Sequence, residues 1–123
     1  MELSHRIENN ICIISVKGEI DSRETLEFKS YISSLMNEPD QKGIVLNCEK
    51  MPYIDSSGIG VFISLLQEAK KKDIGFVMCG FDDTVKVLFE AMGLDRIMNN
   101  YPTEEEAIES FNPTEETEEE ENE

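Results

Sequence analysis

Short apolar runs of strand character alternate along this chain with segments whose apolar residues recur at helical spacing. The runs Ile11–Val16, Gly43–Cys48 and Gly75–Cys79 have the length and composition of buried strands. Three stripes keep the helical period: Phe28, Ile32, Leu35 and Met36; Ile59, Phe62, Ile63 and Leu66; Val85, Leu88, Phe89 and Met92. Strands that alternate with helices predict an α/β fold with parallel strands at the centre and right-handed crossovers.

The first residues predict a different kind of pairing. Ile7 opens a short strand, and Asn9 and Asn10 form a turn into Ile11–Val16, so the two strands pair as an antiparallel hairpin. A short strand near Ile97 would close the other edge. We therefore expect a mixed, mostly parallel sheet of four to five strands with helices packed on it and an N-terminal antiparallel hairpin.

Polar residues and glycine mark the expected helix ends. Ser22 is a good N-cap for the first helix, and Asp82 or Asp83 suits the start of the third. Gly93 suits the left-handed residue just past the end of the third helix.

The C-terminal part divides into a helix and an acidic tail. Thr103 and Glu106 have capping-box spacing, so we expect a last helix with Ala107, Ile108 and Phe111 docking inward. Residues 112–123 hold seven glutamates and no basic residue, and without apolar side chains we expect them to be disordered. The chain thus divides into a domain at 1–111 and a tail at 112–123. The tail is interpreted as a solvated extension, or alternatively as a segment that tunes association with a basic partner.

Charge excludes some classes of partner. The 123 residues fit one domain, and 27 acidic against 11 basic residues give a net charge of −16, of which −9 belongs to residues 1–111. This charge opposes binding to nucleic acid and to anionic membrane surfaces. The N-terminus lacks a secretory apolar region, and no apolar stretch approaches the ~20 residues of a membrane helix, so we expect a cytoplasmic protein.

The positions of the three cysteines do not indicate a metal site or a reactive thiol. Cys12, Cys48 and Cys79 each lie inside an apolar run, there is no C-x-x-C pair, and His5 is the only histidine. We interpret them as buried reduced thiols and expect no metal site and no cofactor.

The segment Tyr53–Gly60 places two hydroxyls and two glycines at the start of the second helix. Ser56 and Ser57 lie where unpaired backbone N–H groups favour an anion such as a phosphate. Each glycine in a helix costs about 1 kcal/mol relative to alanine, so Gly58 and Gly60 need a reason. Either the helix packs closely on the sheet, or these residues leave a low patch that a partner can approach.

This segment also carries a family resemblance. The stretch YIDSSGIGVF, with Gly18–Asp21 upstream and Val85–Phe89 and Gly93–Leu94 downstream, resembles the STAS domain of bacterial anti-sigma factor antagonists over residues 4 to 111. The resemblance implies phosphorylation of Ser56, with Ser57 as second choice, by an anti-sigma factor that is a serine/threonine protein kinase. It implies that the unphosphorylated form binds this kinase and frees a sigma factor, that phosphorylation abolishes binding, and that a serine phosphatase resets the switch.

The resemblance also defines a surface and an alternative. It places the turn with Glu19, Asp21 and Ser22 in the kinase interface, although turn geometry and helix capping also account for these residues. The free protein is expected to be a monomer. Solitary STAS domains also resemble accessory subunits that dock on a transporter ATPase, or another scaffold, without a phosphorylation cycle.

Catalysis is not expected. Asp55 could be compared with a phospho-accepting aspartate, but the earliest strands end in no acidic pair to hold magnesium; a helix cap, or an orienting group for Ser56, suits it better. A hydrolase serine would need a base, and no G-x-S-x-G elbow is present. Nucleotide binding or hydrolysis by the domain alone would be supported by a glycine-rich phosphate loop with lysine, and the sequence has no such loop.

Overall fold

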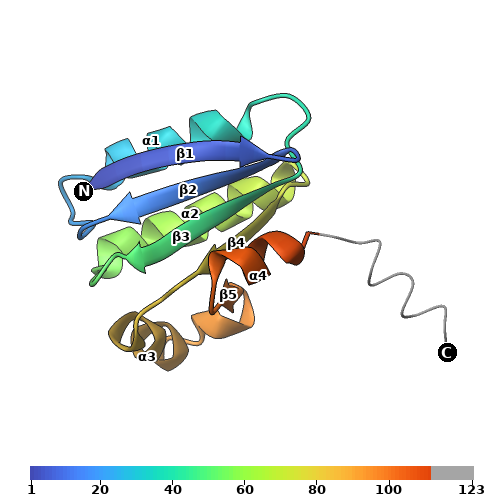
Figure 1. Ribbon diagram of the computed structural model, residues 1–123. Helices are drawn as coiled ribbons and strands as arrows, with labels where there is room; N and C mark the ends of the chain where they lie inside the picture. Colours follow the sequence, from blue (N-terminus) through green and yellow to red (C-terminus); the bar gives the residue numbers. More distant parts are fainter. Residues whose placement is uncertain (112–123) are drawn as a thin grey trace, which may run out of the picture.

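The computed structural model describes residues 1–111, so the predicted disorder of residues 112–123 lies outside the described residues. Within the described part, five strands form one sheet in the order β1-β2-β3-β4-β5 (Figure 1). They are β1 (Glu2–Glu8), β2 (Ile11–Lys17), β3 (Gly43–Lys50), β4 (Gly75–Cys79) and β5 (Asn100–Tyr101). The β1–β2 pair is antiparallel and the other three pairs are parallel, as expected.

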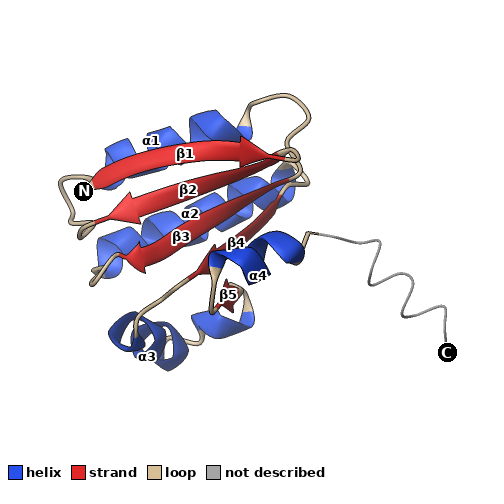
Figure 2. Ribbon diagram, viewed as in Figure 1, coloured by secondary structure: helices blue, strands red, loops and turns tan. Residues whose placement is uncertain are grey.

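Helices cover both faces of this sheet (Figure 2). They are α1 (Thr25–Met36), α2 (Ser56–Lys71), α3 (Asp83–Ala91), the 3₁₀ helix η1 (Leu94–Arg96) and α4 (Glu104–Glu109). The main core lies between the sheet and α1, α2 and α3, and a smaller core lies under α4 on the opposite face. Strand alternation separates the two: Cys12 and Ile14 of β2 enter the main core, whereas Ile11 and Ile13 enter the smaller one.

Aromatic rings join the three helices of the main core. Phe28 of α1 stacks on Phe62 of α2 at 5.5 Å between ring centroids, and Phe62 meets Phe89 of α3 edge-on at 6.0 Å. Phe89 in turn contacts Phe81, in the loop after β4, at 4.7 Å. Such pairs add about 0.5–1.5 kcal/mol each beyond the area they bury.

The smaller core is closed by a ring on two glycines. Gly43 and Gly75 are paired in the β3–β4 register, and a Cβ at either position would overlap the ring of Phe111. Thr103 Oγ1 accepts the Glu106 N–H at 3.1 Å, which confirms the predicted helix start. Ala107 is fully buried, and the inward docking of the last helix is confirmed.

One predicted helix cap is wrong, and one predicted strand is displaced along the chain. Ser22 does not cap the first helix, because residues 22–24 form a turn in which Asp21 Oδ1 accepts the Arg23 N–H at 2.9 Å, and α1 begins only at Thr25. The predicted last strand closes the sheet, but it begins at Asn100, three residues beyond Ile97, which follows η1 and is half exposed.

The predicted state of the cysteines is confirmed, since Cys12, Cys48 and Cys79 are free thiols and buried. Burial raises the pKa of Cys12 to about 11 and that of Cys79 to about 12. Among the helices of residues 1–111, none has the length and apolarity needed to cross a membrane.

Candidate functional site

The loop after β2 and the loop after β3 are joined by hydrogen bonds beside the start of α2. The Gly18 N–H donates to the Lys50 carbonyl at 2.9 Å, and Ile20 pairs with Ile54 in an isolated parallel bridge. Both isoleucines are buried. The residue after each one, Asp21 and Asp55, therefore lies at the same surface, close enough for the charge of Asp21 to oppose ionisation of Asp55.

Asp55 is the N-cap of α2, as predicted. Its Oδ1 accepts the Gly58 N–H at 2.9 Å and the Ser57 hydroxyl at 2.7 Å. These hydrogen bonds, that from Ser57 first, hold the pKa of Asp55 below its ordinary value. The side chain that Asp55 orients is thus Ser57, and the alternative that it orients Ser56 is wrong.

The two serines differ in what their hydroxyls do. Both are exposed at the first turn of α2, but Ser57 donates to Asp55 whereas Ser56 makes no side-chain hydrogen bond to any of residues 1–111. Ser56 is the first residue of the helix, where backbone N–H groups lack intrahelical partners. Its hydroxyl is therefore the one that can be modified without breaking a contact.

The two glycines serve different purposes. Gly58 is buried, and a Cβ there would lie 2.6 Å from Ile54 Cγ1, so this glycine lets α2 approach the chain below it. Gly60 is exposed, and a Cβ there would meet nothing within 4 Å. Close packing thus accounts for Gly58, and Gly60 belongs to the open surface beside Ser56.

The turn predicted as part of an interface lies beside this helix start. Asp21 Oδ2 accepts a hydrogen bond from the Arg23 guanidinium at 3.0 Å, and this contact lowers the pKa of Asp21. Turn geometry therefore accounts for Asp21. Glu19 and Ser22 are exposed, and their side chains accept or donate no hydrogen bond within the described part of the chain.

Sequence reasoning missed two apolar side chains at this end of the molecule. Leu26, in the first turn of α1, is 76% exposed, and Tyr53, two residues before Asp55, is 48% exposed. Leu26 lies off the apolar stripe of its helix, which was the available signal. Their exposure is what an interface anchor has before its partner binds.

The arrangement suits binding and modification. His5 lies on β1, and its Nδ1 is 2.7 Å from the Tyr31 hydroxyl, with which it forms a hydrogen bond. It therefore does not act as a base for either serine. No group of three or more acidic, cysteine or histidine side chains within residues 1–111 could hold a metal ion.

Comparison with known proteins points to one family. The model of the STAS domain family matches residues 2–107. The anti-sigma-B factor antagonist of Staphylococcus aureus is 31% identical over 86 residues, which cover 70% of this chain and 79% of that protein.

Solved structures share the fold. The unphosphorylated form of the anti-sigma factor antagonist SpoIIAA superposes with a TM-score of 0.77 at 24% identity, over 91% of this chain and 97% of that one. The structure of the phosphorylated form of Bacillus SpoIIAA superposes with a TM-score of 0.69. The STAS domain of a SulP transporter from Vibrio cholerae gives 0.71 at 17% identity, over 91% and 88% of the two chains.

Proposed function

Since the chain belongs to the STAS domain family, we propose that it is an anti-sigma factor antagonist switched by phosphorylation of Ser56. The unphosphorylated form binds an anti-sigma factor serine/threonine kinase and frees a sigma factor, and the phosphorylated form does not bind. A serine phosphatase restores the active form. The protein acts without catalysis of its own, as a monomer, in the bacterial cytoplasm where sigma factors work.

This proposal rests on one observation: the hydroxyl groups of Ser56 and Ser57 differ in their hydrogen bonding. The Ser57 hydroxyl is held by Asp55 at 2.7 Å, whereas that of Ser56 is exposed and unengaged within residues 1–111. A kinase that takes Ser57 must first break the contact with Asp55. A kinase that takes Ser56 leaves the cap of α2 intact.

The charge around Ser56 supports a switch that acts without refolding. A phosphate adds about −1.5 to −2 charges, which a helix start accommodates while solvent surrounds it. Inside an interface the same charges must be desolvated beside the carboxylates of Asp55 and Asp21. A loss of ~2.7 kcal/mol, within the cost of one unpaired buried charge, weakens binding about a hundredfold.

The surface around Ser56 supports a partner of defined chemistry. Gly60 leaves room for close approach, Leu26 and Tyr53 offer apolar anchors, and Glu19 adds to the negative charge. We therefore propose that Glu19, Asp21 and Ser22 contact cationic or dipolar groups of the kinase. Asp21→Asn keeps the turn acceptor and removes the charge, so weaker binding by this variant supports a charge contact, and unchanged binding contradicts it.

The decisive experiment combines modification and binding. The chain is incubated with ATP and each candidate anti-sigma kinase, and the phosphate is located by intact mass and peptide mapping. Binding to the kinase is measured for wild type, Ser56→Ala and Ser56→Asp, with Ser57→Ala as the matched control. We expect phosphate on Ser56, binding retained by both alanine variants, and binding lost in Ser56→Asp. Phosphate on Ser57 alone, or full binding by Ser56→Asp, contradicts the proposal.

A second candidate function is docking on a transporter ATPase or another scaffold without a phosphorylation cycle. The similarity to the STAS domain of a SulP transporter favours keeping this alternative. It predicts that no candidate kinase modifies the chain, and that a captured transporter partner binds wild type and Ser56→Ala equally.

A further inference from the structure

A cavity of about 290 Å³ lies beside α3, and neither Ser56 nor Ser57 lines it. It is formed by the loop after β4, by α3, by η1 and its following turn, and by β5. Phe81, which is partly exposed, and the buried side chains of Phe89 and Met98 make up its apolar lining. Apolar walls with a few convergent polar groups are typical of small-molecule sites.

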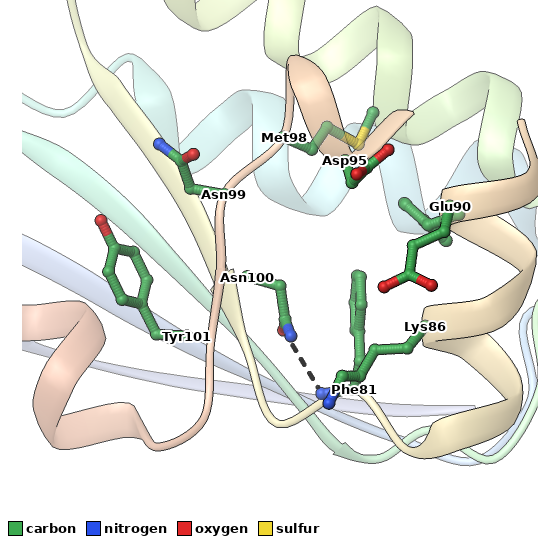
Figure 3. Close-up of a pocket in the computed structure, with 9 residues that line it drawn as sticks. Phe81, Lys86, Glu90, Asp95, Met98, Asn99, Asn100 and Tyr101 are labelled. Carbon is green, nitrogen blue, oxygen red and sulfur yellow. Dashed lines mark hydrogen bonds between the residues drawn. The ribbon is translucent and has the colours of Figure 1, made fainter. Parts of the chain in front are cut away.

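Charged side chains of both signs turn toward this cavity (Figure 3). Glu90 of α3 and Asp95 of η1 bring two carboxylates, and Lys86 of α3 brings an ammonium. None of the three makes an ion pair or a side-chain hydrogen bond within residues 1–111, although Lys86 and Glu90 have the i, i+4 spacing at which opposite charges pair. All three are therefore available to a ligand.

The amide of Asn100 has a fixed orientation in the same cavity. Its Oδ1 accepts the Phe81 N–H at 3.3 Å, which joins β5 to the loop after β4 and leaves the amide N–H groups to donate elsewhere. Figure 3 shows the Asn100 side chain on the opposite side of this segment from those of Asn99 and Tyr101, although all three residues line the cavity. Among the polar groups that line the cavity, the Lys86 ammonium and the Asn100 amide can donate, the carboxylates of Glu90 and Asp95 can accept, and Asn99 and Tyr101 can do either.

We propose that this cavity binds a small zwitterion of the free amino acid class with an apolar side chain. The ligand's ammonium is accepted by Glu90 and Asp95, and its carboxylate takes hydrogen bonds from Lys86 and Asn100. Its side chain covers Phe81, Phe89 and Met98. The volume lies just below the roughly 300–1,000 Å³ of ligand pockets, which fits a small ligand such as an amino acid.

Three small probes test each half of this recognition. Amide signals of the ¹⁵N-labelled full chain are followed by NMR while L-leucine is added to ~10 mM, enough to occupy most sites at a Kd of about 1 mM. The same titration uses 4-methylpentanoate, which lacks the amine, and 3-methylbutylamine, which lacks the carboxylate. We expect saturable shifts at Phe81, Glu90, Asp95 and Asn100 with leucine, and at least tenfold weaker binding of both analogues.

Variants at the cavity mouth separate this site from non-specific binding. The double change Glu90→Gln and Asp95→Asn removes both carboxylates at exposed positions, and we expect leucine binding to weaken at least tenfold. Glu27→Gln, an exposed change on α1, is the charge control and should bind leucine as wild type does.

Several outcomes overturn the proposal. It fails if leucine, isoleucine, valine, methionine and phenylalanine all give no saturable shift, or if the shifts lie away from the cavity. It also fails if the amine without a carboxylate binds as well as leucine, because the site then recognises a simple cation. None of these readouts involves the kinase or Ser56, so this proposal and the proposed function fail independently.

Discussion

The two glycines of α2 give a matched pair of substitutions with opposite expected effects on stability. Alanine is a better helix former than glycine by about 1 kcal/mol, and neither residue has the positive φ that excludes a side chain. Gly60→Ala adds its methyl group to open space and should stabilise the fold by up to about 1 kcal/mol.

Gly58→Ala adds the same methyl group 2.6 Å from Ile54 Cγ1, and Ile54 and nearby Ile20 are both buried. Something must move, and overpacking of this kind costs about 1–3 kcal/mol. The helix-propensity gain is similar in the two variants and roughly cancels when they are compared. We therefore expect Gly58→Ala to be less stable than Gly60→Ala by about 1–3 kcal/mol.

Urea unfolding followed by far-ultraviolet circular dichroism measures this difference, provided that both variants keep the wild-type slope. A Gly58→Ala variant as stable as Gly60→Ala would refute the reasoning, because it would mean that α2 moves away from Ile54 at no cost. The same two proteins test the site: Gly60→Ala should weaken kinase binding although it stabilises the fold, because its methyl group enters the open surface beside Ser56.

Three further predictions concern the rest of the domain. Phe111→Ala should lower the free energy of unfolding, measured in urea, by about 2 kcal/mol. This is less than the roughly 3–5 kcal/mol lost when a fully buried phenylalanine is replaced by alanine, because Phe111 is only half-buried. The hydrogen bond from Arg6 is the chief cause of the lowered pKa of Glu104 in the folded protein. The ionised carboxylate therefore contributes fully to the free energy of unfolding above the unfolded-state pKa of about 4.3, and this contribution is lost as the pH falls through the lower pKa of the folded state. The stability gap between wild type and Glu104→Gln should therefore shrink in acid, measured as urea midpoints at neutral pH and below about pH 4. The three thiols, whose pKa values burial raises, should resist iodoacetamide at about pH 8 in the folded protein and react fully in denaturant, as followed by mass spectrometry.

Each of these has a result that would contradict it. A Phe111→Ala variant with wild-type stability would mean that the ring does not contribute to the smaller core. A gap that widens in acid would reverse the sign of the Glu104 argument. Rapid alkylation of the folded protein would mean that the thiols become exposed by local opening, which native-state hydrogen exchange would then locate.

The central fold could be predicted because its signals are local and strong. The strand-like runs and the helical stripes have different periods, and each period specifies which face of the element is buried. Caps at Asp55, at Thr103 and at Asp82 or Asp83 can be predicted because the capping acceptor lies within three residues of the N–H group that donates to it, and the structure selects Asp82.

The errors arose where several residues compete for one role. The side chains of Asp21 and Ser22 can both accept hydrogen bonds from backbone N–H groups. In the structure Asp21 accepts the Arg23 N–H and forms a turn, and Ser22 does not cap α1. Similarly, Asp55 had two neighbouring hydroxyls within reach and took Ser57. Such choices depend on backbone angles that a residue pattern does not define.

Other features depend on contacts between distant segments. The proximity of Asp21 to Asp55 follows from the pairing of Ile20 with Ile54, and the cavity beside α3 requires η1 and β5 to be in place. The exposure of Leu26 and Tyr53 likewise becomes visible only when the neighbouring surfaces are known.

The ring of Phe111 on Gly43 and Gly75 couples these three positions, because each limits the side chains that the others can carry. A side chain at either glycine requires the ring to move, and loss of the ring leaves both glycines uncovered. Homologues should therefore fall into two groups, one with an aromatic residue after the last helix and glycine on both strands, and one with side chains on the strands and a small residue at the end. Intermediates between them would lose stability, so we expect the three positions to change together.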